Sequence, residues 1–122
     1  LSERMNMRTL KFRAWDKRDS TMRDVESINF SARVADLRMN PGIHDIVFPE
    51  QCEVMQSTGM NDKNGMEIFE GDILHSETDV NYPVSWSTTQ VSFVANKGMY
   101  HIVEWNNYAI VGNIYENPEL LK

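Results

Sequence analysis

Turn-forming residues alternate with short apolar runs between residues 56 and 74, and this alternation constrains the fold more than any other feature of the sequence. Residues 62–65 are typical of a tight turn, because aspartate accepts backbone amide hydrogens while asparagine and glycine tolerate a positive φ. Residues 66–69 follow as a short strand, residues 70–72 bend the chain again, and residues 73–75 begin another strand. We therefore expect a small β-barrel or sandwich to begin in this segment.

The N-terminal part of the chain predicts a β-hairpin. Residues 8–15 alternate between apolar and polar side chains, which is the pattern of a β-strand with one face on a core. Residues 16–20 are polar and turn-like, and residues 22–30 continue as a second strand. We expect the basic residues on the outer face and the tip of this hairpin, and three of them are candidate binding residues: Arg13, Lys17 and Arg18.

Two later segments are less regular. Residues 31–40 fit both a short helix capped by Ser31 and an alternating strand, and we favour the strand. Residues 77–89 are rich in Asp, Asn, Ser and Thr and contain a proline. This composition predicts a surface loop, interrupted by a brief extended piece at residues 84–86.

The last third of the chain is predicted as strands that end in one helical turn. Residues 90–104 form a hairpin around a turn at residues 96–98, and residues 108–115 form the final strand. Asn117 and Pro118 suit the cap and the first residue of the closing helical turn.

The frequent turns, many strands and few short helices indicate a mainly β fold, a β-rich form of the α+β class. We expect an N-terminal β-hairpin subdomain over residues 7–50, packed on a small SH3-like barrel over residues 51–122. Residues 1–6 would precede the fold as a tag or disordered N-terminus, because the chain does not begin with Met and this segment has no apolar signal core.

The 122 residues carry a net charge of −6 that is unevenly distributed. Residues 1–30 hold seven basic and five acidic residues, whereas residues 31–122 hold five basic and thirteen acidic residues. Nucleic-acid binding depends on neutralising phosphates, so this acidic body does not favour a nucleic-acid partner. No apolar run is long enough to span a membrane, and we expect no membrane partner.

The sequence contains one cysteine, Cys52, so no disulfide forms within the chain. This fits a reducing, cytoplasmic location. We expect Cys52 to be a small core residue rather than a nucleophile, because no histidine is near it in the sequence and free cysteine is among the most buried residue types.

Two groups of residues suggest a metal or acid–base site, but both fit structural roles better. Four carboxylates crowd residues 62–72 and match a calcium-loop pattern only in part. Asp62 is expected to stabilise a turn, and Asp72 the bend at Gly71. The histidines come from three separate segments without the spacing of metal ligands: His44, His75 and His101. We therefore predict no catalytic residue, no metal ligand and no cofactor.

Aromatic residues near predicted turns and loops are the second set of candidate binding residues. They are Trp86, Trp105 and Tyr108. Exposed aromatic side chains on β-domains are used by peptide-binding and base-stacking modules. The alternative is that they pack in the core or between subunits, which is the commoner use of Trp and Tyr.

Three segments, taken in order, resemble one protein family. Residues 7–16 look like its opening, residues 55–73 like its middle and residues 111–121 like its end. The residues that carry the middle and end motifs are Gly59, Asp62, Asn64, Gly65, Glu70, Gly71, Asp72, Gly112, Asn113, Glu116, Asn117 and Pro118. These are marks of the YopX proteins encoded by bacteriophages and prophages.

The resemblance implies a phage-derived, cytoplasmic protein of β-rich fold. It carries over no catalytic residue, because the family has no established activity. Residues 76–104 match the family only in length and texture, so the resemblance says little about that region. In the last motif, Asn113, Glu116 and Asn117 are expected to hydrogen-bond the backbone and to fix the tail onto the domain.

These observations favour a non-catalytic interaction or assembly module of phage origin. Its partner would be a phage or host protein, or further copies of this chain in a homo-oligomer. A nucleic-acid-binding SH3-like module that uses the basic hairpin is the alternative, and a small metal-dependent hydrolase built on the carboxylates ranks last. We therefore do not expect an enzyme.

Overall fold

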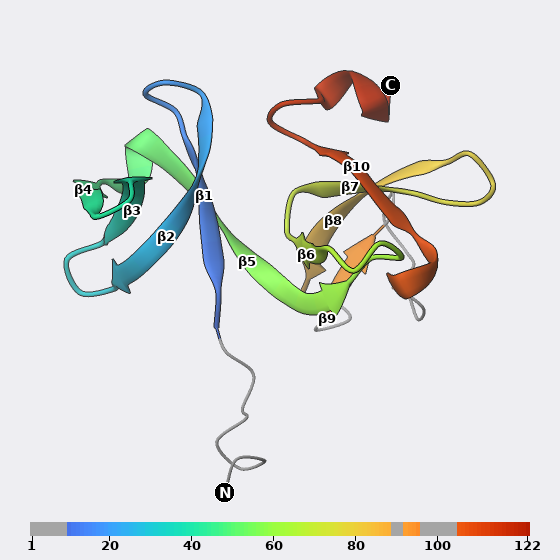
Figure 1. Ribbon diagram of the computed structural model, residues 1–122, viewed down its shortest axis with the longest axis horizontal. Coiled ribbons are helices and arrows are strands. Elements are labelled where there is room, and N and C mark those ends of the chain that lie inside the picture. Colours follow the sequence, from blue (N-terminus) through green and yellow to red (C-terminus); the bar gives the residue numbers. More distant parts are fainter. Residues whose placement is uncertain (1–9, 89–91, 96–104) are drawn as a thin grey trace, which may run out of the picture. The chain divides into compact units, whose positions relative to one another are not determined.

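The structure, a computed structural model, describes residues 10–88, 92–95 and 105–122 (Figure 1). The chain divides into two compact units, which are treated separately below: unit 1, Leu1–Gln56, and unit 2, Ser57–Lys122. The division falls six residues after the subdomain boundary expected from the sequence, within a single strand, β5 (Cys52–Asn61).

Unit 1 is an antiparallel sheet in the order β4-β3-β2-β1-β5, to which β5 contributes its first half. The other elements are β1 (Phe12–Asp16), β2 (Thr21–Asn29), β3 (Val34–Asn40), β4 (Ile43–Val47) and the 3-10 turn η1 (Pro49–Gln51). Strands β1 and β2 form the predicted N-terminal hairpin, with Trp15 opposite Met22. The predicted strand over residues 31–40 is confirmed as β3. The hairpin is thus part of a larger sheet.

The buried residues of unit 1 are small or medium in size. Its core cluster consists of Ala14, Ala35, Leu37, Val47 and Cys52. These side chains share one face of the sheet because the register sets Ala35 opposite Val47, and successive side chains of a strand point to opposite faces. Cys52 is a core residue, as predicted, and burial raises the pKa of its thiol.

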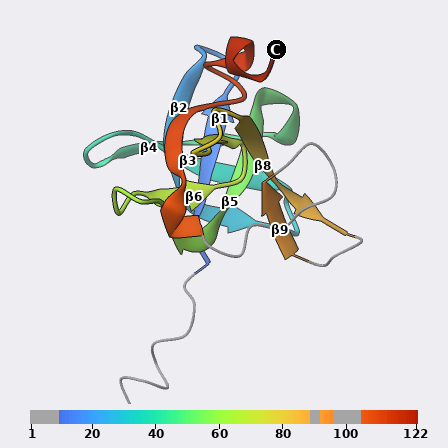
Figure 2. The ribbon, with the colours of Figure 1, turned by 90° about the vertical axis from the view of Figure 1, so that its right-hand side faces the viewer.

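Unit 2 contains a second antiparallel sheet in the order β10-β7-β8-β9. Its elements are β6 (Glu67–Phe69), β7 (Asp72–His75), β8 (Asn81–Ser87), β9 (Ser92–Ala95), η2 (Trp105–Asn107), β10 (Ala109–Asn113) and η3 (Pro118–Leu121). Strand β6 pairs with the second half of β5, while β8 and β9 lie side by side (Figure 2). The core holds larger side chains than that of unit 1: Ile68, Leu74, Val84, Ala95 and Trp105.

The mainly β prediction is confirmed. Within the described residues the strands form two open antiparallel sheets. The structure therefore does not confirm the predicted SH3-like barrel in that part of the chain. The predicted hairpin turn at residues 96–98 and its return over 99–104 lie outside the described residues. No helix in the described part of the chain is long and apolar enough to cross a membrane.

Residues 81–87 form β8, so the extended piece predicted at residues 84–86 is confirmed, whereas the predicted loop is wrong over residues 81–83 and 87. The composition of this segment is loop-like, yet it pairs with β7 on one side and β9 on the other. Alternating contacts place Val84 in the core. Pairing on both edges has therefore overridden the local preference of a segment that contains Pro83.

The turn at residues 62–65 is confirmed, and it is anchored by one carboxylate. Asp62 Oδ1 accepts hydrogen bonds from the backbone N–H of Asn64 at 2.9 Å and of Met66 at 2.8 Å. Gly65, which has a φ of 81°, closes the turn by donating its N–H to the Asp62 carbonyl at 3.0 Å. Asp62 Oδ2 accepts from Ile110 N–H at 3.0 Å. Burial opposes ionisation of this carboxyl, but the three backbone donors outweigh it and lower the pKa of Asp62.

The bend before β7 is likewise stabilised by an aspartate side chain that accepts a backbone hydrogen bond. Asp72 Oδ2 accepts from the backbone N–H of Phe69 at 2.8 Å, and Gly71 adopts a φ of 87°, which a residue with a side chain rarely takes. The Gly71 carbonyl also accepts from Ile114 N–H at 2.8 Å. The predicted role of Asp72 in fixing this bend is confirmed.

The C-terminal motif forms a local hydrogen-bond network, as expected. Asn113 Oδ1 accepts from the N–H groups of Tyr115 and Glu116, and Asn113 Nδ2 donates to Glu116 Oε1 at 2.8 Å. Asn117 stands at the N-cap position of η3, as predicted, but its side chain makes no capping hydrogen bond; its Oδ1 accepts from Asn113 N–H at 3.1 Å instead. A Cβ atom at Gly112 would lie 2.5 Å from Asn117 Oδ1, so a larger residue there would displace the Asn117 side chain.

Candidate functional site

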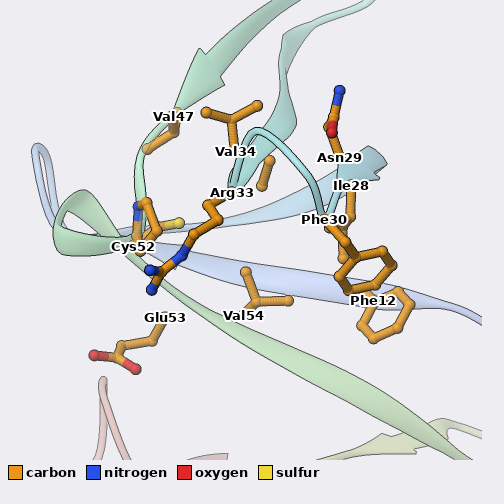
Figure 3. A pocket seen from close by; sticks show the side chains of 12 residues that line it. Phe12, Ile28, Asn29, Phe30, Arg33, Val34, Val47, Cys52, Glu53 and Val54 are labelled. Carbon is orange, nitrogen blue, oxygen red and sulfur yellow. The ribbon is translucent and has the colours of Figure 1, made fainter.

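The apolar face of unit 1 continues beyond its core into an open groove (Figure 3). The groove has a volume of about 520 Å³. Its apolar lining comes from all five strands of the unit and the turn between β2 and β3, and includes Phe12, Ile28, Phe30, Val34, Val47 and Val54. We call this hollow the unit 1 groove.

The register of the strands builds the groove. Ile28 lies opposite Ala35 across β2 and β3, and Val54 lies opposite Ala14 across β5 and β1, so their side chains share a face. Ala35 and Cys52 are buried at the floor, and their small size leaves room above them. The rim is open to solvent, because Phe30 is 79% exposed and Val54 is 42% exposed.

A tight turn at residues 30–33 places one cation on the rim. Asn29 Oδ1 accepts from the backbone N–H of Ala32 at 2.9 Å, and Arg33 adopts a φ of 60°, the left-handed conformation. In Figure 3 the Arg33 side chain extends toward the end of the groove that holds Cys52 and Glu53, while the rings of Phe12 and Phe30 lie at the other end.

The basic residues predicted at the tip of the hairpin are neutralised within unit 1. Lys17 Nζ lies 3.0 Å from Glu53 Oε1. Arg18 contacts Asp16 at 2.9 Å and Asp45 at 2.8 Å. Lys17 and Arg18 are exposed at the tip of the hairpin, as expected, and their role in binding stays a prediction. The third candidate, Arg13, is half-buried in β1.

Asp16 is the buried centre of these ion pairs, although the sequence pattern indicated only a polar turn. Its carboxylate accepts two side-chain hydrogen bonds and one backbone hydrogen bond from Arg18, and a further one from Arg23 Nε at 3.0 Å. The hydrogen bond from the Arg18 guanidinium is the main cause that lowers the pKa of Asp16 to about 2, against the opposing effect of burial.

The predicted aromatic residues separate into core and surface. Trp105 is only 9% exposed and belongs to the core of unit 2, so the packing alternative describes it. Tyr108 packs on that core and meets the Tyr82 ring edge-on, with centroids 6.5 Å apart. Trp86 is 46% exposed and contacts Phe93 edge-to-face at 5.0 Å. It alone remains a candidate surface residue.

The carboxylates and histidines that suggested a metal site serve other contacts. Asp62 and Asp72 accept backbone hydrogen bonds, and Glu67 accepts from Ser57 Oγ. His44 Nδ1 lies 2.6 Å from Asp36 Oδ1 in unit 1, and His75 contacts Asn81 and Asp79 in unit 2. Over residues 10–88, 92–95 and 105–122, no three His, Cys, Asp or Glu side chains gather as a metal site would require.

Sequence reasoning did not find the unit 1 groove or Arg33. The alternating pattern indicated which side chains share a face of one strand, but the groove depends on the register among five strands. In the sequence, Asn29 is a residue type that favours turns, but nothing there indicated that Arg33 would line a groove.

Comparisons with known proteins found a matching family model and a similar solved structure. The family model described as YopX protein matches residues 11–122, so the resemblance found from the motifs is confirmed. The crystal structure of protein EF1440 from Enterococcus faecalis is similar over 95% of this chain and 100% of that chain, with 27% sequence identity and a TM-score of 0.71. No curated protein matches.

Proposed function

The chain belongs to the YopX family. We propose that it is a non-catalytic interaction module that holds an apolar segment of a protein partner in the unit 1 groove. The module would act in the cytoplasm of a bacterial cell that carries a phage or prophage. Its partner would be a phage or host protein, or another copy of the chain.

The observation that carries this proposal is the open apolar rim of the unit 1 groove. Phe30 and Val54 are large apolar residues that remain exposed directly beside buried residues of the core. Burying apolar area releases roughly 25 cal/mol per Å², and aromatic residues at the centre of an interface carry much of its binding energy. A concave apolar hollow of this size suits an inserted side chain or a short peptide segment.

Polar groups around the groove are few, which also supports binding rather than catalysis. The one thiol at the floor, Cys52, is buried, and its pKa is raised, so little of it is the reactive thiolate at neutral pH. Glu53 on the rim is already paired with Lys17.

The test is to select peptides from a displayed random-sequence library on the purified full chain, and then to measure their affinities for two variants. Phe30→Ser removes the exposed ring from the groove. Ile46→Ser is the matched control, because Ile46 is another exposed apolar residue of the same sheet, at 53%, and it does not line the groove. We expect at least tenfold weaker binding by Phe30→Ser and no change by Ile46→Ser.

Two results would contradict the proposed function. One is that selection enriches no peptide above an unrelated control protein. The other is that enriched peptides bind wild type and Phe30→Ser equally well while Trp86→Ser abolishes binding, which would move the site to unit 2.

A further inference from the structure

Arg33 differs from the other arginines whose contacts are known in unit 1. Arg18 and Arg23 both contact Asp16, and Arg38 contacts Glu26. Arg33 makes no ion pair and no side-chain hydrogen bond in the part of the chain that the structure describes. It is also the one of these four that lines the groove.

The carboxylate of Glu53, which lines the same groove, does not pair with Arg33. Glu53 lines the same groove, but its Oε1 is engaged by Lys17 Nζ at 3.0 Å. An occupant that brings its own carboxylate would therefore meet an unpaired guanidinium beside apolar walls. Charge-assisted hydrogen bonds between a guanidinium and a carboxylate are strong and directional, and they strengthen where apolar groups exclude water.

The fold holds Arg33 at this position. The tight turn at residues 30–33 is closed by the bond from Ala32 N–H to Asn29 Oδ1, and Arg33 leads directly into β3, where it keeps a left-handed backbone conformation. The same turn carries Phe30, so the backbone positions of Arg33 and of the most exposed ring of the groove lie within four residues of chain.

We propose that the partner segment bound in the unit 1 groove is an acidic–apolar peptide, in which a large apolar side chain packs against Phe30 and Phe12 and a carboxylate pairs with Arg33. This inference rests on the proposed function and adds the chemistry of its partner. A peptide fits better than a fatty acid, because the groove lies open along its rim and does not enclose a chain in a tunnel.

The test uses the same random-sequence peptide library on four forms of the full chain: wild type, Arg33→Gln, Arg33→Glu and Arg38→Gln. Arg33→Gln keeps a long polar side chain at the left-handed position and removes only the charge. Arg38→Gln is the matched control, because it removes one positive charge from an exposed residue of β3, the strand that follows Arg33, outside the groove.

We expect wild type and Arg38→Gln to enrich peptides with Asp or Glu at a fixed spacing from a large apolar residue. Arg33→Gln should bind these peptides about tenfold more weakly, a typical loss for one charge-assisted hydrogen bond. Changing the peptide acid to its amide should cause the same loss in wild type and no further loss in Arg33→Gln. Arg33→Glu should enrich Lys or Arg at that position.

The outcomes separate the two proposals. Apolar peptides that depend on Phe30 but show no acidic position, or acidic peptides that bind Arg33→Gln as well as wild type, would overturn the inference and leave the proposed function standing. Absence of any peptide that depends on Phe30 would overturn both. Binding of dodecanoate in an Arg33-dependent manner, with no peptide enriched, would overturn the peptide and assign the carboxylate to a fatty acid.

Discussion

Units 1 and 2 are both small antiparallel sheets, but they use their sequence differently. In unit 2, Trp105 packs in the core, and buried polar side chains such as Asp62 and Asn113 stabilise the turns by accepting backbone hydrogen bonds. Unit 1 has a core of smaller side chains and leaves the end of its apolar face open as a groove. Apart from residues 55 and 56, the middle motif of the family lies in unit 2, and so does the whole of the end motif.

The difference teaches that the most recognisable motifs need not mark the binding surface. The contacts of Asp62, Asp72 and Asn113 are hydrogen bonds to the chain's own backbone, which fix turns. The candidate site lies in unit 1, outside the middle and end motifs. We infer that unit 2 is a rigid frame and that unit 1 carries the proposed binding surface, the unit 1 groove.

The strongest prediction for the frame concerns Asp62. Asp62→Ala leaves the N–H groups of Asn64, Met66 and Ile110 without their acceptor, and we expect a loss of about 3 kcal/mol in the free energy of unfolding. Urea denaturation of the full chain measures this loss. Glu77→Ala, an exposed carboxylate of the same unit, should change stability by less than about 0.5 kcal/mol. Equal losses for the two variants would contradict the role given to Asp62.

The tail is the next test of the frame. Deleting residues 117–122 removes the acceptor of Asn113 N–H and the carbonyl of Leu120 that receives Asn81 Nδ2 at 2.9 Å. We expect about 2 kcal/mol of destabilisation, seen as a fall of several degrees in Tm. Deleting Lys122 alone should have little effect. An unchanged Tm after the longer deletion would show that the C-terminal motif does not hold unit 2 together.

Asp16 provides a pH test that applies to unit 1. The pKa of its carboxyl falls from 3.8 to about 2 on folding, so the native state binds fewer protons than the unfolded state in this range. Its contribution is complete above about pH 4 and is lost as the pH falls through about 2, and it amounts to about 2 kcal/mol. Asp16→Asn should flatten the fall of stability between pH 4 and 2, whereas Asp24→Asn, an exposed neighbour, should not. Parallel curves for wild type and Asp16→Asn would contradict the ion-pair account.

The smallest expected change in stability belongs to the groove. Phe30→Ser should alter the free energy of unfolding by less than about 0.5 kcal/mol, because the ring is 79% exposed and contributes little to the folded core. A loss of more than 2 kcal/mol in urea denaturation would show that Phe30 is a structural residue, and the contrast between an open unit 1 and a closed unit 2 would fail.

Local patterns predicted the local features well. Alternating side chains and turn-forming residues predicted the N-terminal hairpin, β3, the turn at Asp62 and the bend at Gly71, because each depends on residues a few positions apart. Burial of Cys52 followed from residue type alone.

The long-range features were not predicted from the sequence, because they depend on which strands become neighbours in the fold. The bond from Ile110 to Asp62 spans 48 residues, and the inclusion of residues 81–87 in a sheet required both β7 and β9. The burial of Asp16 needed two arginines folded over it. The unit 1 groove needed five strands in register, and nothing local distinguishes Arg33 from the paired arginines around it.

The most direct test of the division between frame and surface is to add an enriched peptide to the isotopically labelled full chain and to follow the backbone amide chemical shifts by NMR. The account predicts shifts at residues 28–35 and 52–54, with residues 62–74 unchanged. Shifts centred on Trp86 and β8, with residues 28–35 unchanged, would contradict it and place the binding surface in unit 2.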